Sequence, residues 1–280
     1  MLSKLVKLNN GSYLPYMGLG TWELTNATEV VKEALKIGYR LIDTAVLYGN
    51  EKECAQGVLE WMKEDPEHNR REHVCYITKL WTNQHGYQNA KKAIKGCLEQ
   101  IDGLKYIDLL LIHAPTQGKK MRLETYQAMQ EAVDEGVVKS IGVSNYGIDH
   151  LKELLFWPGL KYKPVANEIE VSPWCMRQEL CNFCRANDIA VIAYAPFSHA
   201  NRINDPDAVA IAKKKGVTPA QVLVRWSIQK GYIPIPKTKN LDRLATNFDV
   251  LSFELSDVEM KTLDHPDVHD PSDWEVTTCP

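Results

Sequence analysis

The chain has 280 residues, of which 44% are hydrophobic and 25% are charged, a balance typical of a globular protein with a substantial core. Its 33 basic and 36 acidic residues give a formal net charge of −3, so it offers no field that would attract nucleic acid or an anionic membrane. The N-terminal stretch lacks the pattern of a secretory signal. We therefore expect a cytoplasmic protein with no nucleic-acid or membrane partner.

Short apolar runs typical of strands alternate with amphipathic stretches typical of helices along almost the whole chain. Strands are predicted near 16–20, 39–43, 74–78, 108–112, 138–142, 164–168, 189–193 and 232–235. Helices are predicted near 27–37, 50–64, 87–101, 122–136, 148–155, 177–187, 205–215, 219–229 and 240–247. LVKLNN and SYLPYM predict a small hairpin ahead of them. The alternation predicts an α/β fold, a single (β/α)₈ TIM barrel over residues 1–280 with an N-terminal β-hairpin and extra helices.

The rival fold is an open, doubly wound sheet that binds a dinucleotide. Gly18 and Gly20 form a G-x-G, and the acidic Asp43 follows some twenty residues later, as in a dinucleotide-binding fingerprint. However, Glu23 occupies the position of the third glycine, and the preceding PYM is a poor buried strand. The pair of glycines is better interpreted as a tight turn.

The seven cysteines are scattered, and their odd number favours free thiols over a disulfide framework. Cys181 and Cys184 do form a C-x-x-C, but they lie in a helix-like stretch with an apolar stripe that includes Leu180 and Phe183. No second pair of ligands completes a zinc set. We therefore interpret these residues as a packed helix face and expect no metal site.

Polar residues with acid–base chemistry stand where three apolar runs end. RLIDTAVLYGNE carries Asp43 and Tyr48, HVCYITKLW carries Lys79, and YIDLLLIHAP carries His113. Charged groups at the mouths of buried strands cost free energy unless something there uses them. Because the carboxyl ends of barrel strands converge, we expect these four side chains to meet in one pocket.

These residues lie within sequence blocks that resemble those of the aldo-keto reductase family, in order and at compatible spacing over essentially the whole chain. The blocks are GLGTWEL, DTAVLYGNE, ITKLW, YIDLLLIHAP, GVVKSIGVSNY, NEIEVSPW and IPIPKTKNLDRLATN. The chain is most similar to the short fungal reductases of aldehydes, keto compounds and aldoses. The resemblance implies a (β/α)₈ barrel that binds NADPH in extended form without a Rossmann domain.

The resemblance implies that Asp43, Tyr48, Lys79 and His113 are the catalytic residues. Carbonyl reduction needs a hydride, expected from nicotinamide C4, and a proton on oxygen, expected from Tyr48. The Lys79 ammonium would lower the pKa of Tyr48, and Asp43 would hold that ammonium charged and oriented. His113 would donate a hydrogen bond to the carbonyl oxygen.

The resemblance also implies the binding residues. Ser144, Asn145 and Glu168 would hold the carboxamide, Tyr194 would stack on the nicotinamide, and Lys237, Thr238, Arg243 and Asn247 would bind the adenosine phosphate. The other expected cofactor contacts are Gly20, Thr21, Trp22, Asp43, Ala195 and Phe197. Trp22 and Trp81 would wall the substrate site, together with Tyr48 and His113. The planar donor fork of Arg243 suits a 2′-phosphate and favours NADPH over NADH.

Two features depart from the family pattern. Glu168 stands where the family usually has glutamine. Its negative charge would favour the oxidised cofactor over the reduced one, unless burial keeps the side chain protonated. The tail after Leu263 is short, which predicts an open pocket, and Trp274 either reaches the mouth of the pocket or packs elsewhere.

We therefore expect an NADPH-dependent reductase of aldehydes and reactive ketones such as aldoses and α-keto esters, acting as a monomer on small-molecule carbonyl substrates. One alternative is a cofactor-sensing regulatory subunit of a membrane channel with the same barrel. Another is a (β/α)₈ hydrolase, which would need a carboxylate pair such as Asp43 and Glu168.

Overall fold

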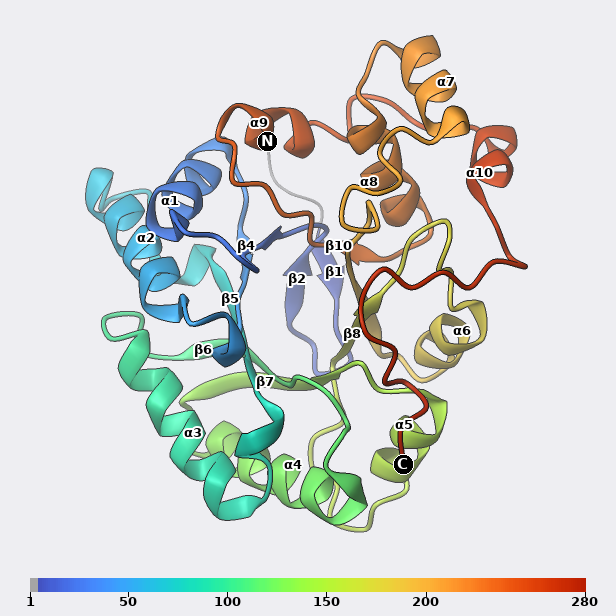
Figure 1. The fold of residues 1–280 in the computed structure, drawn as a ribbon. Coiled ribbons are helices and arrows are strands. Elements are labelled where there is room, and N and C mark those ends of the chain that lie inside the picture. Colours follow the sequence, from blue (N-terminus) through green and yellow to red (C-terminus); the bar gives the residue numbers. More distant parts are fainter. Residues whose placement is uncertain (1–4) are drawn as a thin grey trace.

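The computed structural model describes residues 5–280, which form a barrel of strands surrounded by helices (Figure 1). Residues 1–4, part of the stretch interpreted as lacking a secretory signal, lie outside the described residues. Seen down the barrel in Figure 1, the strands occupy the centre and the helices form the outer ring.

A single eight-stranded sheet forms the barrel, and its strands follow one another in chain order from β3 to β10 with every neighbouring pair parallel. The strands are β3 (Leu19–Gly20), β4 (Leu41–Asp43), β5 (Cys75–Leu80), β6 (Ile107–Ile112), β7 (Val138–Ser144), β8 (Ala166–Glu170), β9 (Ala190–Tyr194) and β10 (Ile233–Pro234). Two backbone hydrogen bonds bring the first strand against the last, from Gly18 N to Pro234 O at 2.9 Å and from Gly20 N to Pro236 O at 3.1 Å. Parallel strands in this order confirm the predicted (β/α)₈ barrel and exclude the doubly wound sheet.

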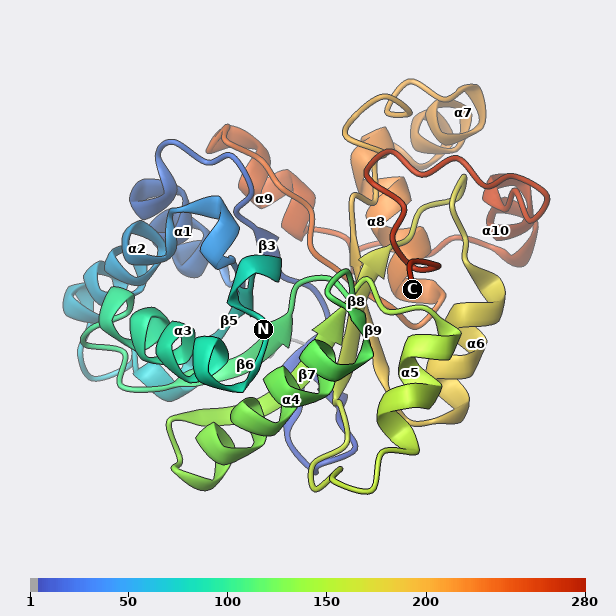
Figure 2. The same cartoon turned by 60° about the horizontal axis from the view of Figure 1, so that its bottom comes forward.

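Helices lie between the strands and cover their outer faces (Figures 1 and 2). They are α1 (Ala27–Ile37), α2 (Glu51–Glu64), α3 (Tyr87–Gln100), α4 (Gly118–Asp134), α5 (Ile148–Leu155), α6 (Gln178–Ala186), α7 (Pro206–Lys215), α8 (Pro219–Gln229), α9 (Asp242–Phe248) and α10 (Asp257–Leu263). The start of α8 shows how neighbouring side chains fix where a helix begins. Thr218 Oγ1 accepts a hydrogen bond from Gln221 N, and Pro219 occupies the first turn, where its missing N–H costs nothing.

The predicted hairpin is present as the antiparallel pair β1 (Leu5–Lys7) and β2 (Tyr13–Pro15), and it covers the N-terminal end of the barrel. Leu8 and Leu14 pack in one cluster with the barrel residues Leu41, Ile77, Leu109, Leu111, Ala166, Ile192 and Ile233. The amide of Asn9 donates to Pro164 O and Asp188 O, just before β8 and β9. The hairpin therefore closes this end with apolar side chains and leaves the opposite end for a site.

The interior of the barrel changes from apolar to charged along each of three strands. Successive side chains of a strand point to opposite faces, so residues two apart share a face. The apolar Leu41, Ile77 and Ala166 thus precede by two positions the charged Asp43, Lys79 and Glu168. All six residues are buried. The polar end of the barrel interior is the end at which the strands finish.

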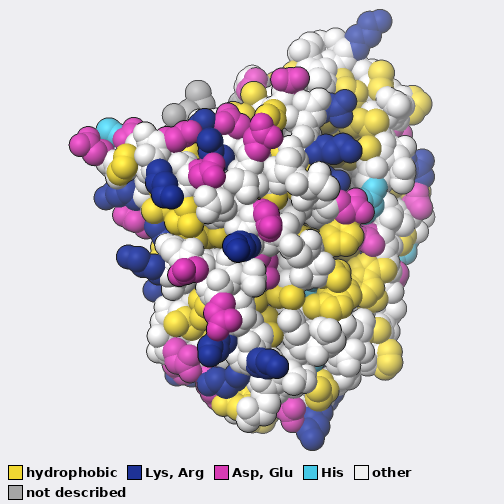
Figure 3. Space-filling model, turned by 60° about the vertical axis from the view of Figure 1, so that its left-hand side comes forward, with side chains coloured by type: hydrophobic (Ala, Val, Ile, Leu, Met, Phe, Trp, Pro, Cys, Tyr) yellow, Lys and Arg dark blue, Asp and Glu magenta, His cyan; other side chains and the backbone are white. Residues whose placement is uncertain are grey.

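The outer helices carry charges of both signs, interspersed over the face shown in Figure 3. Several are paired across helices; Lys32 of α1, for example, lies 3.6 Å from Glu60 and 3.4 Å from Glu64 of α2. Within residues 5–280, no helix is both long and apolar enough to cross a bilayer. All seven cysteines are free, and Cys181 and Cys184 are buried in α6, which confirms their interpretation as a packed helix face.

Candidate active site

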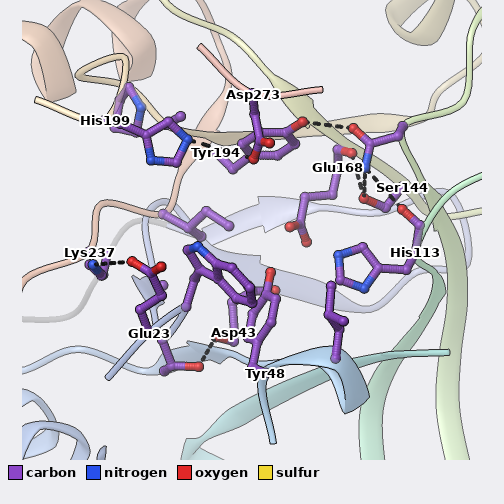
Figure 4. A pocket seen from close by; sticks show the side chains of 18 of the residues that line it. Glu23, Asp43, Tyr48, His113, Ser144, Glu168, Tyr194, His199, Lys237 and Asp273 are labelled. Carbon is purple, nitrogen blue, oxygen red and sulfur yellow. Dashed lines mark hydrogen bonds and ion pairs between the residues drawn. The ribbon is translucent and has the colours of Figure 1, made fainter. Parts of the chain in front are cut away.

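A cavity of about 540 Å³ opens at the C-terminal ends of the strands. Figure 4 shows side chains from several strands and from the loops beyond them pointing into it. All four residues predicted to be catalytic line this cavity or contact a residue that does, since Asp43, Tyr48 and His113 line it and Lys79 hydrogen-bonds to two of these. The ends of the strands and the segments that follow them have therefore brought residues distant in sequence to one place, as the barrel topology requires.

Lys79 is the centre of the charged group and is completely buried. Its Nζ donates to the two carboxylate oxygens of Asp43 at 2.7 and 2.8 Å and to the backbone oxygen of Thr44 at 3.0 Å. It lies 3.2 Å from Glu168 Oε1 and 3.4 Å from the hydroxyl of Tyr48. Burial opposes the charged form of Lys79, but the Asp43 and Glu168 carboxylates outweigh it and raise the pKa of Lys79. Both carboxyl groups thus contact one ammonium group, an arrangement unlike the free pair that a glycoside hydrolase needs.

Tyr48 reaches the cavity from a 3₁₀ turn, Val46–Tyr48, that directly follows β4. The turn ends at Gly49, whose φ of 65° lies in the left-handed region that favours glycine. The expected effect of Lys79, to lower the pKa of Tyr48, is present, but burial has the larger effect and leaves the pKa of Tyr48 above its ordinary value. The expectation of a net lowering was therefore wrong, because it considered the charge and not the desolvation of the phenol.

His113 follows β6 and lies between aromatic rings. Its ring centroid is 5.7 Å from that of Tyr48 and 4.9 Å from that of Trp81, both in edge-on orientation. Burial, followed by the charge of Lys79, lowers the pKa of His113 well below its ordinary range, so the imidazole is neutral. A neutral imidazole still donates from one ring nitrogen, which suffices to polarise an oxygen.

Asn145 connects several of the residues predicted to hold the carboxamide. Its backbone N and the hydroxyl of Ser144 both donate to Glu168 O, at 2.8 and 2.9 Å. Its side-chain nitrogen donates to His113 O at 3.0 Å, and its side-chain oxygen accepts from the hydroxyl of Tyr194 at 2.9 Å. Asn145 has a φ of 59°, a left-handed conformation that asparagine tolerates better than most residues. The network fixes the ends of β6, β7, β8 and β9 relative to one another.

The loop after β3 forms another wall of the cavity. Thr21 donates to Asp43 O from both its backbone N at 3.1 Å and its hydroxyl at 2.8 Å, which holds the backbone of Asp43 in place. A side chain on Gly20 would come within 2.8 Å of Ile235 O, so the close approach of β3 and β10 requires glycine there. Trp22 packs edge-on against Tyr48 at 4.9 Å. Ala195 and Phe197 line the cavity after β9.

The residues predicted to bind the adenosine phosphate are only partly at the cavity. Lys237 lines it and pairs with Glu23 at 3.7 Å. Thr238, Arg243 and Asn247 are absent from the lining residues. Arg243 is exposed on α9, whereas Asn247 of the same helix is buried, so the two residues differ in accessibility.

The C-terminal tail crosses the mouth of the barrel and supplies residues that the sequence analysis missed (Figure 2). Glu170, fully buried at the end of β8, accepts hydrogen bonds from Ser272 N at 2.7 Å, Ser272 Oγ at 2.6 Å and Asp273 N at 3.1 Å. Asp273 in turn lies 3.6 Å from His199 Nε2 across the cavity mouth. A charged residue two positions after Glu168 on a buried strand was a signal that something pairs with it.

Trp274 of the same tail reaches the mouth of the cavity and does not pack elsewhere, so the first of the two expectations for this residue is confirmed. Its ring centroid lies 5.4 Å from that of Trp81, and both residues line the cavity. Together with Trp22, they give the outer part of the cavity aromatic walls, of the kind that surround small organic ligands.

Comparison with known proteins agrees with this geometry. The model of the Aldo/keto reductase family matches residues 16–267. An uncharacterized oxidoreductase of Saccharomyces cerevisiae is 54% identical over 282 residues, covering all of both chains. The glyoxal reductase of Bacillus subtilis is 36% identical, covering 94% of this chain and 92% of its own. A Bombyx mori aldo-keto reductase, solved in complex with NADP, superposes with a TM-score of 0.86 at 34% identity over 94% of this chain and 92% of its own. This chain therefore belongs to the aldo/keto reductase family of oxidoreductases.

Proposed function

We propose that the protein reduces aldehydes and reactive ketones to alcohols with NADPH, and that Tyr48 protonates the oxygen. The observation that carries the proposal is the contact between the buried Lys79 ammonium, held by Asp43, and the hydroxyl of Tyr48 at 3.4 Å beside an open cavity. A phenol next to a fixed cation and at the wall of a cavity is suited to proton transfer.

The residues around Tyr48 have complementary tasks in such a reaction. When bound, the reduced nicotinamide supplies the hydride. Tyr48 holds its proton at neutral pH and gives it up only when negative charge develops on the substrate oxygen. The phenolate then formed lies beside Lys79, whose positive charge stabilises it. His113, neutral and facing the same space, donates a hydrogen bond to the oxygen that becomes negative.

The polar groups of the cavity suit a nicotinamide ring. Tyr194 offers an aromatic ring at the end of β9, and Ser144 and Asn145 offer a hydroxyl and an amide at the end of β7. Glu168 Oε2 is buried and has no hydrogen-bond partner among residues 5–280. A buried polar atom without a partner costs free energy, so a ligand that satisfies it is expected.

A preference for NADPH over NADH is supported by the cations beyond β10. Lys237 stands at the rim of the cavity, and the exposed Arg243 lies on the helix that follows. Guanidinium groups bind phosphate through a planar pair of donors. The Bombyx mori relative was solved with NADP.

The proposed substrates are small carbonyl compounds. Trp22, Trp81 and Trp274 provide apolar walls beside the polar groups at the inner end of the cavity. One relative is named a glyoxal reductase and acts, by that name, on a small dicarbonyl.

The test is the consumption of NADPH with a panel of aldehydes, including a nitrobenzaldehyde, and with aldoses and α-keto esters. Loss of nicotinamide absorbance must be matched by alcohol product. Wild-type protein should turn over part of this panel, and Tyr48→Phe should not. A protein that binds NADPH but reduces nothing in the panel would contradict the proposal, and would favour the alternative of a cofactor sensor.

A further inference from the structure

Lys79 has fewer donors than acceptors around it. A lysine ammonium has three N–H groups. The three nearest acceptors, the two oxygens of Asp43 and the backbone oxygen of Thr44, lie at 2.7, 2.8 and 3.0 Å from Nζ and equal its N–H groups in number. Glu168 Oε1 at 3.2 Å and the hydroxyl of Tyr48 at 3.4 Å are more distant, so Glu168 has no N–H of Lys79 to itself.

The second oxygen of Glu168 is less well satisfied. Oε2 is buried and has no hydrogen-bond partner within residues 5–280, and the carboxyl group points into the cavity in Figure 4. An ionised carboxylate in this position would lack the donors that normally stabilise it. A carboxylic acid, by contrast, needs one acceptor and keeps one oxygen free.

The charges around Glu168 also favour its protonated form. The titratable groups that face it are Asp43 from β4, Tyr48 from the following turn, Lys79 from β5 and Tyr194 from β9. Lys79 is the one cation of this set, and Asp43 already balances it. Burial, and next the charge of Asp43, raise the pKa of Glu168 well above its ordinary range.

We propose that Glu168 is a neutral carboxylic acid in the ligand-free protein and that it releases its proton when the oxidised, but not the reduced, nicotinamide cofactor binds. This inference rests on the proposed function. Glu168 is then a residue that distinguishes the two redox states of the cofactor by charge.

Glu168 would respond to the redox state of the cofactor because the charges of Asp43, Lys79, Glu168 and the nicotinamide ring would share one buried space. With Glu168 protonated, Asp43 and Lys79 cancel, and a neutral reduced ring leaves the sum unchanged. The oxidised ring adds one positive charge, which ionisation of Glu168 cancels. The O–H bond breaks with both electrons remaining on the carboxylate, and the proton passes to the buffer, so no oxidation state changes. By linkage, rising pH strengthens the binding of the oxidised cofactor relative to the reduced one, by at most about tenfold per pH unit.

Titration calorimetry tests the inference without turnover. NADP⁺ and NADPH are each titrated into the protein near neutral pH in buffers of different ionisation enthalpy, which yields the number of protons released. We expect about one proton for NADP⁺, no release for NADPH, and neither release nor a pH-dependent ratio of dissociation constants in Glu168→Gln. Equal release with both cofactors, or release that persists in Glu168→Gln, would overturn the inference. If neither cofactor binds, the proposed function fails as well.

An infrared measurement on the wild-type protein keeps the test independent of whether the variant folds. The C=O stretch of a buried, protonated carboxyl group should be present in the ligand-free protein and should disappear on addition of NADP⁺ but not of NADPH. Its absence from the ligand-free protein at neutral pH would show that Glu168 is ionised, and would refute the inference while leaving the proposed reductase activity intact.

Discussion

Replacing Lys79 by methionine would leave two buried carboxyl groups without their cation. Lys79 and Asp43 have side-chain exposures of 0% and 2%, so solvent cannot take the place of the ammonium. Removing one partner of a buried ion pair costs about 3–5 kcal/mol, because the other charge remains unpaired. Since 1 kcal/mol changes the melting temperature of a large domain by roughly 2–4 °C, we expect Lys79→Met to melt about 6–20 °C below the wild type.

The stability penalty of Lys79→Met should depend on pH, and the direction of that dependence follows from the pKa of Asp43. Burial raises the pKa of Asp43 in the folded protein and the charge of Lys79 opposes this rise, so without Lys79 the folded-state pKa of Asp43 rises further above its unfolded-state value. The folded protein then binds a proton that the unfolded chain lacks, and its stability is lost as pH rises through the folded-state pKa. The penalty of Lys79→Met should therefore shrink as the pH is lowered toward about 3, where Asp43 is protonated in both states.

The assay is denaturant and thermal unfolding of a double-mutant cycle. Asp43→Asn combined with Lys79→Met removes both charges, and we expect it to be more stable than the sum of the single changes predicts, by about 1–3 kcal/mol. Lys95→Met is the matched control, because Lys95 is 79% exposed and 3.8 Å from Glu99, and its loss should cost under about 1 kcal/mol. Additive single changes, or a penalty that does not depend on pH, would refute the reasoning.

Three other predictions follow from the same geometry. Tyr48→Phe should lower kcat/KM for aldehyde reduction by about 10²–10⁴ with an unchanged circular dichroism spectrum, and retained alcohol formation would exclude Tyr48 as the acid. Arg243→Ala should raise the KM for NADPH strongly and scarcely affect NADH, whereas equal effects would remove Arg243 from phosphate binding. Burial, then the charge of Arg122, lowers the pKa of His85 to about 4 from 6.5. The unfolded chain therefore binds the extra proton as pH falls through this interval, and stability should fall by about 3 kcal/mol, a loss that His85→Leu should abolish in acid unfolding curves.

Local signals sufficed for most of the fold. The predicted helices 148–155 and 219–229 have the bounds of α5 and α8, because their ends are set by neighbouring residues such as Thr218 and Pro219. The short α10 was missed although Ser256 and Glu259 form a capping box that marks its start. The polar residues at the ends of apolar runs predicted the location of the site, since convergence of strand ends is a property of the barrel.

Long-range contacts and burial could not be predicted in this way. Glu170 binds residues of the tail 102 and 103 positions later, and no local pattern specifies such a contact. The net direction of the pKa shift of Tyr48 depends on how completely its neighbours exclude water, which requires coordinates. The protonation proposed for Glu168 likewise depends on coordinates, because it rests on the number of acceptors around the Lys79 ammonium.

The anchoring of the C-terminal tail has a consequence for how substrate choice could evolve. Asp273 and Trp274 border the cavity, yet they are held by Glu170 and by the ion pair of Arg177 with Glu275 at 2.8 Å, and not by Asp43, Tyr48, Lys79 or His113. Changes between these anchors would reshape the entrance without disturbing the reaction centre. Substrate recognition can thus change while the reacting residues stay the same. The tail is therefore the segment to graft or randomise when the substrate preference is to be altered.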